Sequence, residues 1–175
     1  MNDLELHDDP ASFLAQAGGW LARDPVLTTV VSTVSQRILA ADLRGEPRGD
    51  HPRWWAVLRE DGEVVGVAMR TAPFAPYWVY ALPMPDAAAR DLAQALVARG
   101  EEVTAVNGAL PAAQVLADEI CRLTGGGAVV VHEHMRLWEA PEVTHPALPE
   151  GVLRQARAGE VTLAVTWWNA FGADA

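Results

Sequence analysis

The feature that most constrains the fold of this chain is an Asp-Gly pair between two apolar runs. The first run extends from Trp54 to Arg59 and the second from Val64 to Arg70, with the turn residues 60–63 between them. Aspartate followed by glycine suits the backbone of a tight hairpin turn, which needs positive φ angles. The sequence therefore predicts two antiparallel strands joined by that turn.

Helical and strand patterns follow one another on both sides of this hairpin. Apolar residues recur at helical spacing over 10–23, where Asp9 and Pro10 give a start signal, and again over 25–44. Beyond the hairpin the patterns predict a strand at 77–82, a helix at 86–99, a strand at 103–106, a helix at 111–124 and a long strand at 128–138. This order predicts an α/β (α+β) fold with a mixed, mainly antiparallel sheet flanked by helices.

The two ends of the chain are expected to lie outside this unit. The acidic stretch from Asp3 to Asp9 is interpreted as a solvated tail. At the other end, the patterns predict a strand at 152–156 and a helix at 160–171. The predicted organisation is a domain over 1–139, a proline-rich linker over 140–150, and the first strand and helix of a second, incomplete unit over 151–175.

Charge and composition bound the partners and the compartment. The formal net charge is −10 and the isoelectric point is about 4.8, and no window clusters Lys and Arg. Nucleic acids and anionic membranes need a basic patch, so we expect neither as a partner. The single cysteine, Cys121, rules out an internal disulfide, and the sequence has no apolar run of membrane-spanning length. These features predict a cytoplasmic protein.

Three phrases of the sequence carry a resemblance to a known family. The hairpin WWAVLREDGEVVGVAMR, the strand after it and the segment VNGALPAAQVLADEICRLTGG together resemble the GNAT (GCN5-related N-acetyltransferase) superfamily. More narrowly, residues 10–138 look like the N-terminal half of bacterial proteins built from two such halves in tandem. The segment Val152 to Ala156, followed by Glu160 and Trp167-Trp168, looks like the start of the second half.

The resemblance implies a binding mechanism for acetyl-CoA. Proteins of this superfamily hold acyl-CoA in a V-shaped opening between two strands, and a glycine-rich loop opens a helix whose amides grip the pyrophosphate. The corresponding stretch here, 82–90, has no glycine. Pro83 and Pro85 lack amide donors, and Asp86 places a negative charge where the diphosphate would lie.

The general acid that the resemblance implies is also missing from its expected helix. The superfamily often uses a tyrosine on a later helix to protonate the leaving thiolate. The helix predicted at 111–124 has no tyrosine, and the tyrosines of the chain are Tyr77 and Tyr80. We therefore assign no catalytic, cofactor-binding or metal-binding residue, and acetyl-CoA is a cofactor by resemblance only.

A metal site and an aromatic pocket are the other candidates that the residues suggest. His132 and His134 share one face of the strand predicted at 128–138, and His51 or His145 could supply a third ligand. We favour an exposed polar face instead. The pairs Trp54-Trp55 and Trp167-Trp168 could line a ligand pocket, but we favour core packing, with at most one tryptophan of a strand pair buried.

Two smaller signals have a structural and a functional interpretation. Gly125–Gly127 could form a phosphate-binding nest, but we favour a helix stop. Cys121 could be a nucleophile, but its surroundings hold no basic residue except Arg122, and we favour a buried, inert thiol.

Three functions remain open at the level of the sequence. The first is a catalytically silent GNAT-like half that supports a second half or forms one wall of a substrate cleft. The second is an active acyl-CoA-dependent N-acyltransferase with an atypical loop. The third is a small-ligand or protein-interaction module, in which 151–175 folds back on the domain or exchanges with a second chain as a homodimer.

Overall fold

A computed structural model of the protein describes residues 2–147, 150–152 and 154–174. The chain divides into two units, 1–139 and 140–175. In chain order the first unit contains β1 (Asn2–His7), α1 (Pro10–Leu21), α2 (Thr29–Leu43), β2 (Trp54–Glu60), β3 (Glu63–Arg70), β4 (Val79–Ala81), α3 (Asp86–Ala98), β5 (Val106–Gly108) and α4 (Ala112–Thr124). The second unit contains a short 3-10 helix (Ala158–Glu160) and α5 (Val161–Asp174).

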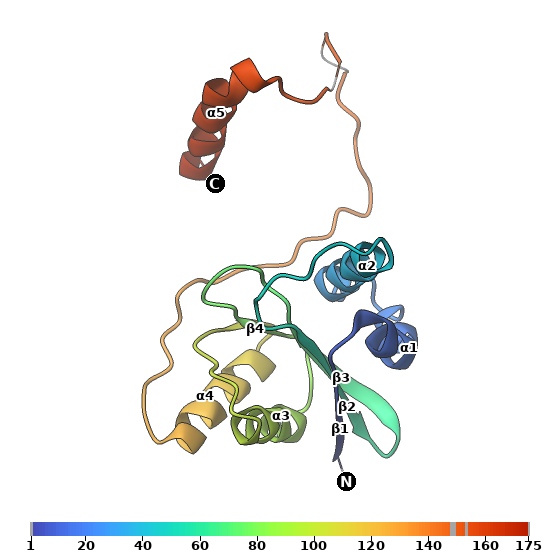
Figure 1. Ribbon diagram of the computed structural model, residues 1–175, viewed down its shortest axis with the longest axis vertical. Helices are drawn as coiled ribbons and strands as arrows, with labels where there is room; N and C mark the ends of the chain where they lie inside the picture. Colours follow the sequence, from blue (N-terminus) through green and yellow to red (C-terminus); the bar gives the residue numbers. More distant parts are fainter. Residues whose placement is uncertain (1, 148–149, 153, 175) are drawn as a thin grey trace. The chain divides into compact units, whose positions relative to one another are not determined.

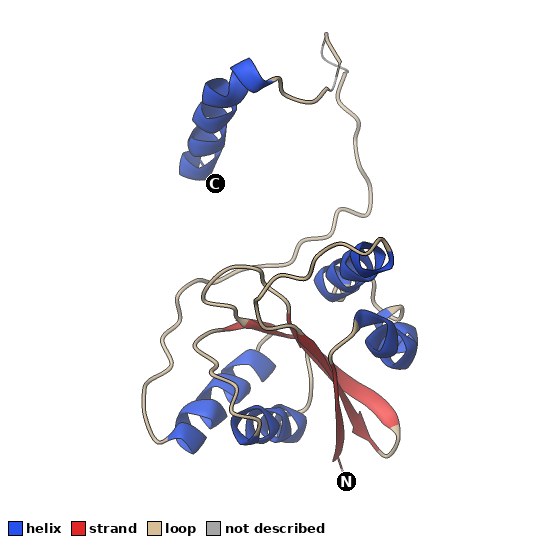
Figure 2. Ribbon diagram, viewed as in Figure 1, coloured by secondary structure: helices blue, strands red, loops and turns tan. Residues whose placement is uncertain are grey.

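The strands of the first unit form one five-stranded sheet in the order β1-β2-β3-β4-β5 (Figure 1). The pairs β1/β2, β2/β3 and β3/β4 are antiparallel, and the pair β4/β5 is parallel. Figure 2 shows helices on both sides of the sheet. The predicted α/β (α+β) class, with a mixed and mainly antiparallel sheet flanked by helices, is therefore confirmed.

The hairpin that anchors the sheet forms as its sequence predicts. β2 ends at Glu60 and β3 begins at Glu63, so Asp61 and Gly62 make the connection. Their φ angles are 51° and 86°, which is the paired positive φ of a hairpin turn that matches the twist of the strands. Glycine accepts this backbone without strain, and aspartate tolerates it better than most residues.

The core has two parts, one on each face of the sheet. On one face α3 and α4 pack against β2, β3 and β4, and Trp54 belongs to this cluster. On the other face α1 and α2 enclose a second cluster that contains Trp55. Both tryptophans are at most 1% exposed, so the expectation that only one of them is buried is wrong. Alternation buries one side chain of each neighbouring pair only when a sheet has one covered face, and here helices cover both.

The start of the chain differs from the predicted solvated tail. Residues 2–7 form β1, which pairs antiparallel with β2 along its whole length. Leu4 and Leu6 pack against the cluster on the α3 side. Because these leucines alternate with acidic residues, the stretch has the period of a strand with one buried face.

Two other predicted strands are wrong. Residues 128–138 have no regular secondary structure, and neither do Val152 and residues 154–156. Leu153, within the second of these stretches, lies outside the described residues. A strand is stable only when a neighbour accepts and donates its backbone hydrogen bonds, and alternation in the sequence does not supply that neighbour.

The second unit is dominated by one helix. The helix predicted at 160–171 is present as α5, and it is preceded by the 3-10 turn rather than by a strand. Among the described residues, no helix combines the length and apolar character needed to cross a membrane.

Candidate functional site

The carboxyl ends of β4 and β5 meet at one edge of the sheet, next to the start of α3. Ala81 lies opposite Gly108 in the parallel ladder, and the chain continues from Ala81 through residues 82–85 into α3. Ligands of parallel strands bind at this kind of edge. The loop that binds the cofactor in the superfamily resembled corresponds to residues 82–90, which lie at this edge. This edge is therefore a candidate site.

The two strands stay hydrogen-bonded at this edge instead of separating. Beyond the ladder, the amide of Ala109 donates to the carbonyl oxygen of Ala81 at 3.0 Å. Gly108 has a φ of 151° and lies so close to β4 that an added Cβ would be 2.0 Å from the Ala81 oxygen. Backbone therefore occupies the space where a gap between the strands would be.

The segment that leads into α3 packs onto the sheet. An added Cβ at Gly66 of β3 would lie 2.4 Å from the Met84 Cβ, so the two backbones are in close approach. Met84 is buried, and Pro85 is the N-cap residue without a side-chain capping bond. The Asp86 carboxylate lies in the first turn and forms an exposed ion pair with Arg90 at 3.7 Å.

This helix start is therefore a poor place for a diphosphate. A helix N-terminus attracts anions because its first amides lack partners, but Pro85 has no amide hydrogen to offer. Asp86 already places a negative charge in the favourable position. Among the described residues, no lysine or arginine other than Arg90 forms an ion pair with this carboxylate.

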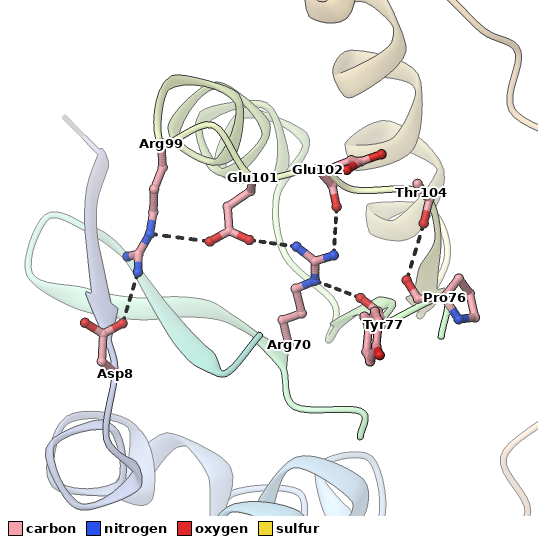
Figure 3. Close-up of polar contacts among 8 residues, drawn as sticks. All are labelled: Asp8, Arg70, Pro76, Tyr77, Arg99, Glu101, Glu102 and Thr104. Atoms are coloured by element: carbon pink, nitrogen blue, oxygen red, sulfur yellow. Dashed lines mark hydrogen bonds and ion pairs between the residues drawn. The ribbon is translucent and has the colours of Figure 1, made fainter. Parts of the chain in front are cut away.

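The opposite edge of the sheet holds a polar network centred on Arg70, at the end of β3 (Figure 3). Its Nε donates to the carbonyl oxygen of Tyr77 at 2.8 Å, and its Nη2 donates to the carbonyl oxygen of Glu102 at 2.7 Å. Its Nη1 bonds the Glu101 carboxylate at 2.7 Å. The guanidinium thus joins the segment before β4 to the segment before β5.

Neighbouring contacts extend this network to Asp8, which follows β1. Arg99, after α3, lies 3.4 Å from Glu101 and donates to Asp8 at 3.1 Å (Figure 3). The Thr104 hydroxyl donates to the carbonyl oxygen of Pro76 at 3.3 Å. Because the buried guanidinium of Arg70 is bonded through all three of its nitrogens, the network is suited to holding loops and not to binding a substrate.

Another set of polar contacts lies on the α2 side of the sheet. The indole nitrogen of Trp55 donates to the Ser35 hydroxyl at 2.9 Å, and the Arg53 guanidinium lies 5.6 Å from the centre of the Trp55 ring. Arg53 also bonds the Asp42 carboxylate, which accepts a second bond from Arg48 at 3.1 Å. The hydrogen bond from Arg53 lowers the pKa of Asp42 below its ordinary value.

The histidines considered as metal ligands are not brought together. Among the described residues, no group of three or more His, Cys, Asp or Glu side chains is arranged to hold a metal ion. His132 and His134 lie in the stretch without strand structure. His51 packs against Gly49 in the loop before β2, and His145 lies in the other unit.

The remaining candidates have structural roles or are exposed. Gly125 adopts a φ of 72° as the C-cap of α4, so the helix-stop interpretation is confirmed. Cys121 is a partly buried free thiol. Burial raises the pKa of Tyr80 on β4 above its ordinary value. Trp167 and Trp168 are exposed on α5, so the core-packing interpretation is wrong for this pair.

A groove lies between α1 and α2 in the first unit. It has a volume of about 340 Å³, and its polar lining consists of Thr29, Ser32 and Gln36. Without a titratable side chain, this groove offers hydrogen bonds but no acid, base or nucleophile of its own.

The residues that shape both ends of these strands could not be predicted from the sequence. Arg70, Gly66 and Gly108 matter because of what lies opposite them in the folded sheet, and nothing in the local sequence marks them. The first strand could have been found, because Leu4 and Leu6 alternate with acidic residues.

Sequence comparison finds no related family, and structure comparison finds one similar chain. No protein-family model matches the sequence, and no curated protein matches it. Among solved structures, the chain is similar to an integron cassette protein from the mobile metagenome of V. cholerae. The two share 14% sequence identity over 80% of this chain and 93% of that one, with a TM-score of 0.32.

Proposed function

We propose that residues 1–139 are a catalytically silent GNAT-like half that supports a catalytic half or forms one wall of a substrate cleft. The order of elements and the parallel pair of β4 and β5 support the resemblance to this superfamily. The main support for the absence of catalysis is the close pairing of β4 and β5 at their carboxyl ends. There the amide of Ala109 donates to the carbonyl oxygen of Ala81, and Gly108 lies against β4. The superfamily's acyl-CoA would need an opening between these strands.

The start of α3 supports the same proposal independently. The resemblance requires amide donors and a neutral or positive surrounding for the pyrophosphate. Here Pro85 and Asp86 occupy that position, and the side chain of Met84 fills the space above Gly66. Neither the strands nor the helix start therefore offers the contacts that an acyl-CoA needs.

Calorimetric titration of the full chain with acetyl-CoA tests the proposal. We expect no binding heat up to millimolar acetyl-CoA, and an assay of free-thiol release with a panel of amines should give no turnover. An active member of the superfamily, run beside it, controls for cofactor quality. Micromolar binding would refute the silent half, and thiol release with any amine would favour an active acyltransferase with an atypical loop.

A role in protein interaction is a second candidate, and α5 favours it. The helix has no charged residue between Val161 and Gly172, and its large apolar side chains are exposed. Thr162, Thr166 and Asn169 share one polar face, so the remaining, apolar surface of the helix needs cover. Light scattering that gives a strict monomer, together with rapid amide exchange in α5, would remove this candidate.

A further inference from the structure

The outer edge of β5 has backbone groups without partners. The amide of Val79 donates to the carbonyl oxygen of Ala105, and the amide of Ala109 donates to that of Ala81, each at 3.0 Å. Successive residues of a strand direct their backbone groups to opposite sides, so the N–H and C=O groups of Val106 and Gly108 point away from β4. β5 is the last strand of the sheet, and no described residue bonds these groups.

A strand added beyond β5 would be covered on one face only. α4 packs on β4 and β5, whereas α1 packs on β1, β2 and β3, and α2 packs on α1 (Figure 1). The added strand would therefore place one row of side chains on α4 and the other row in water. Such a position requires alternating apolar and polar residues, unlike the doubly covered β2.

Residues 128–138 have this alternation and no strand partner. One row consists of Val129, Val131, Glu133, Met135 and Leu137, and the other of Val130, His132, His134, Arg136 and Trp138. Val129 is half-buried, and the other large apolar side chains are exposed, from 56% for Leu137 to 82% for Val130. The stretch directly follows Gly125–Gly127, in which Gly125 and Gly127 have positive φ angles and can act as a hinge.

We propose that residues 128–138 of one copy of this chain pair with the outer edge of β5 in a second copy, in a reciprocal two-fold exchange. The occupant is a second copy, because residues 128–138 do not pair with β5 of their own chain, and every copy carries both the unpaired edge and the unpaired stretch. A two-fold exchange satisfies both on each chain at once. The row with Val131 and Leu137 then lies on the partner's α4, and His132, His134 and Arg136 face water. This inference does not rest on the proposed function.

A matched pair of variants tests the exchange by analytical ultracentrifugation. Val131→Asp with Leu137→Asp places two charges on the row that faces α4, and His132→Asp with His134→Asp places two on the row that faces water. Both sites are exposed in the single chain, so neither variant should unfold it. We expect dimers for the wild type and the His variant, and a dissociation constant at least ~100-fold higher for the Val/Leu variant.

Isotope-filtered NMR on a mixture of labelled and unlabelled chains identifies the contact. The proposal predicts intermolecular amide contacts between residues 128–138 and Val106 or Gly108. It is overturned if the protein is a monomer, if those contacts occur within one chain, or if a dimer persists in both variants with its contacts in α5. A dimer lost equally in both variants would also contradict it, because the two rows would then be equivalent.

Discussion

Two adjacent tryptophans on β2 have different hydrogen bonding although both are buried. The indole N–H of Trp55 donates to Ser35, whereas that of Trp54 is buried without an acceptor among the described residues. A buried donor without a partner costs free energy, and a satisfied one contributes to stability. The contribution of the indole nitrogen to the free energy of unfolding should therefore differ between the two positions.

The two Trp→Phe substitutions measure this difference. Both remove a similar volume, but only Trp55→Phe also leaves the buried Ser35 hydroxyl without its donor. We expect Trp55→Phe to lower the free energy of unfolding by ~1 kcal/mol more than Trp54→Phe. Urea denaturation of both variants gives the comparison. Equal losses, or a larger loss at Trp54, would contradict the assigned bonding.

Arg70 is a buried charged side chain whose three guanidinium nitrogens all donate hydrogen bonds. Its side chain is 6% exposed and that of Glu101 is 16% exposed, so removing the guanidinium leaves a mostly buried carboxylate with only the half-exposed Arg99 beside it. We expect Arg70→Met to cost ~3 kcal/mol of unfolding free energy. Arg90→Met, which removes the half-exposed pair with Asp86, is the control and should cost at most ~0.5 kcal/mol. Similar losses in the two variants would show that the Arg70 network is not structural.

At the scale of elements, the closed edge between β4 and β5 depends on glycine. A Cβ at Gly108 would meet the Ala81 oxygen at 2.0 Å, and the φ of 151° disfavours any other residue. Gly18 in α1 differs, because an added Cβ there meets nothing within 4 Å. The same substitution should therefore have opposite effects at these two positions.

Gly108→Ala should destabilise the protein by ~3 kcal/mol, because the clash forces β5 away from β4. Gly18→Ala should stabilise it by about 0.5–1 kcal/mol, because alanine restricts the unfolded chain and favours the helix. Thermal unfolding of both variants checks the two signs. A neutral Gly108→Ala would mean that β4 and β5 are not closely paired in solution.

The start of the second unit's helix depends on Glu160. Its carboxylate accepts two bonds from the Arg154 guanidinium and one from the Arg157 amide. The Arg154 bonds, and then the Arg157 amide, lower the pKa of Glu160 from 4.5 to about 2. Because the folded pKa is below the unfolded one, this contribution is complete above pH 4.5 and is lost as the pH falls toward 2.

Titration of the Glu160 carboxyl carbon by NMR measures this shift directly. In the wild type the midpoint should lie near pH 2, and in Arg154→Gln it should move toward 4.5. Helicity of α5, followed by the amide signals of its first turn, should fall over the same pH range. A wild-type midpoint near 4.5 would exclude the described start of the helix.

Local sequence predicted most elements of the first unit but not how far each extends in the sheet. The Asp-Gly turn, the Asp9 cap and the Gly125 stop are set by neighbouring residues, and each is confirmed. The stretch 128–138 has an equally clear strand pattern, but it lacks a neighbouring strand. Local alternation does not say which distant segment a strand pairs with. For this reason the sequence predicted a strand at 128–138 that the structure lacks, and it did not predict the close packing of Gly108 against β4.

At the scale of the whole molecule, the two edges of the sheet have different properties. At the Arg70 edge, buried ion pairs and hydrogen bonds hold the loops before β4 and β5. At the opposite edge, β4 and β5 are closed by backbone contacts, and the helix start carries Asp86. Under the proposed function, the sheet and helices are retained, while backbone and the start of α3 occupy the position that a cofactor would need.

The most direct test of this account is a residue-resolved NMR titration of the full chain with coenzyme A. The amide signals of Ala81, Gly108, Asp86 and Ala87 report on the strand edge and on the start of α3. If the backbone closes this edge, these signals stay unchanged up to millimolar coenzyme A. Saturable shifts at these amides with a micromolar midpoint would contradict this closure, because the cofactor would then occupy the edge that the backbone closes.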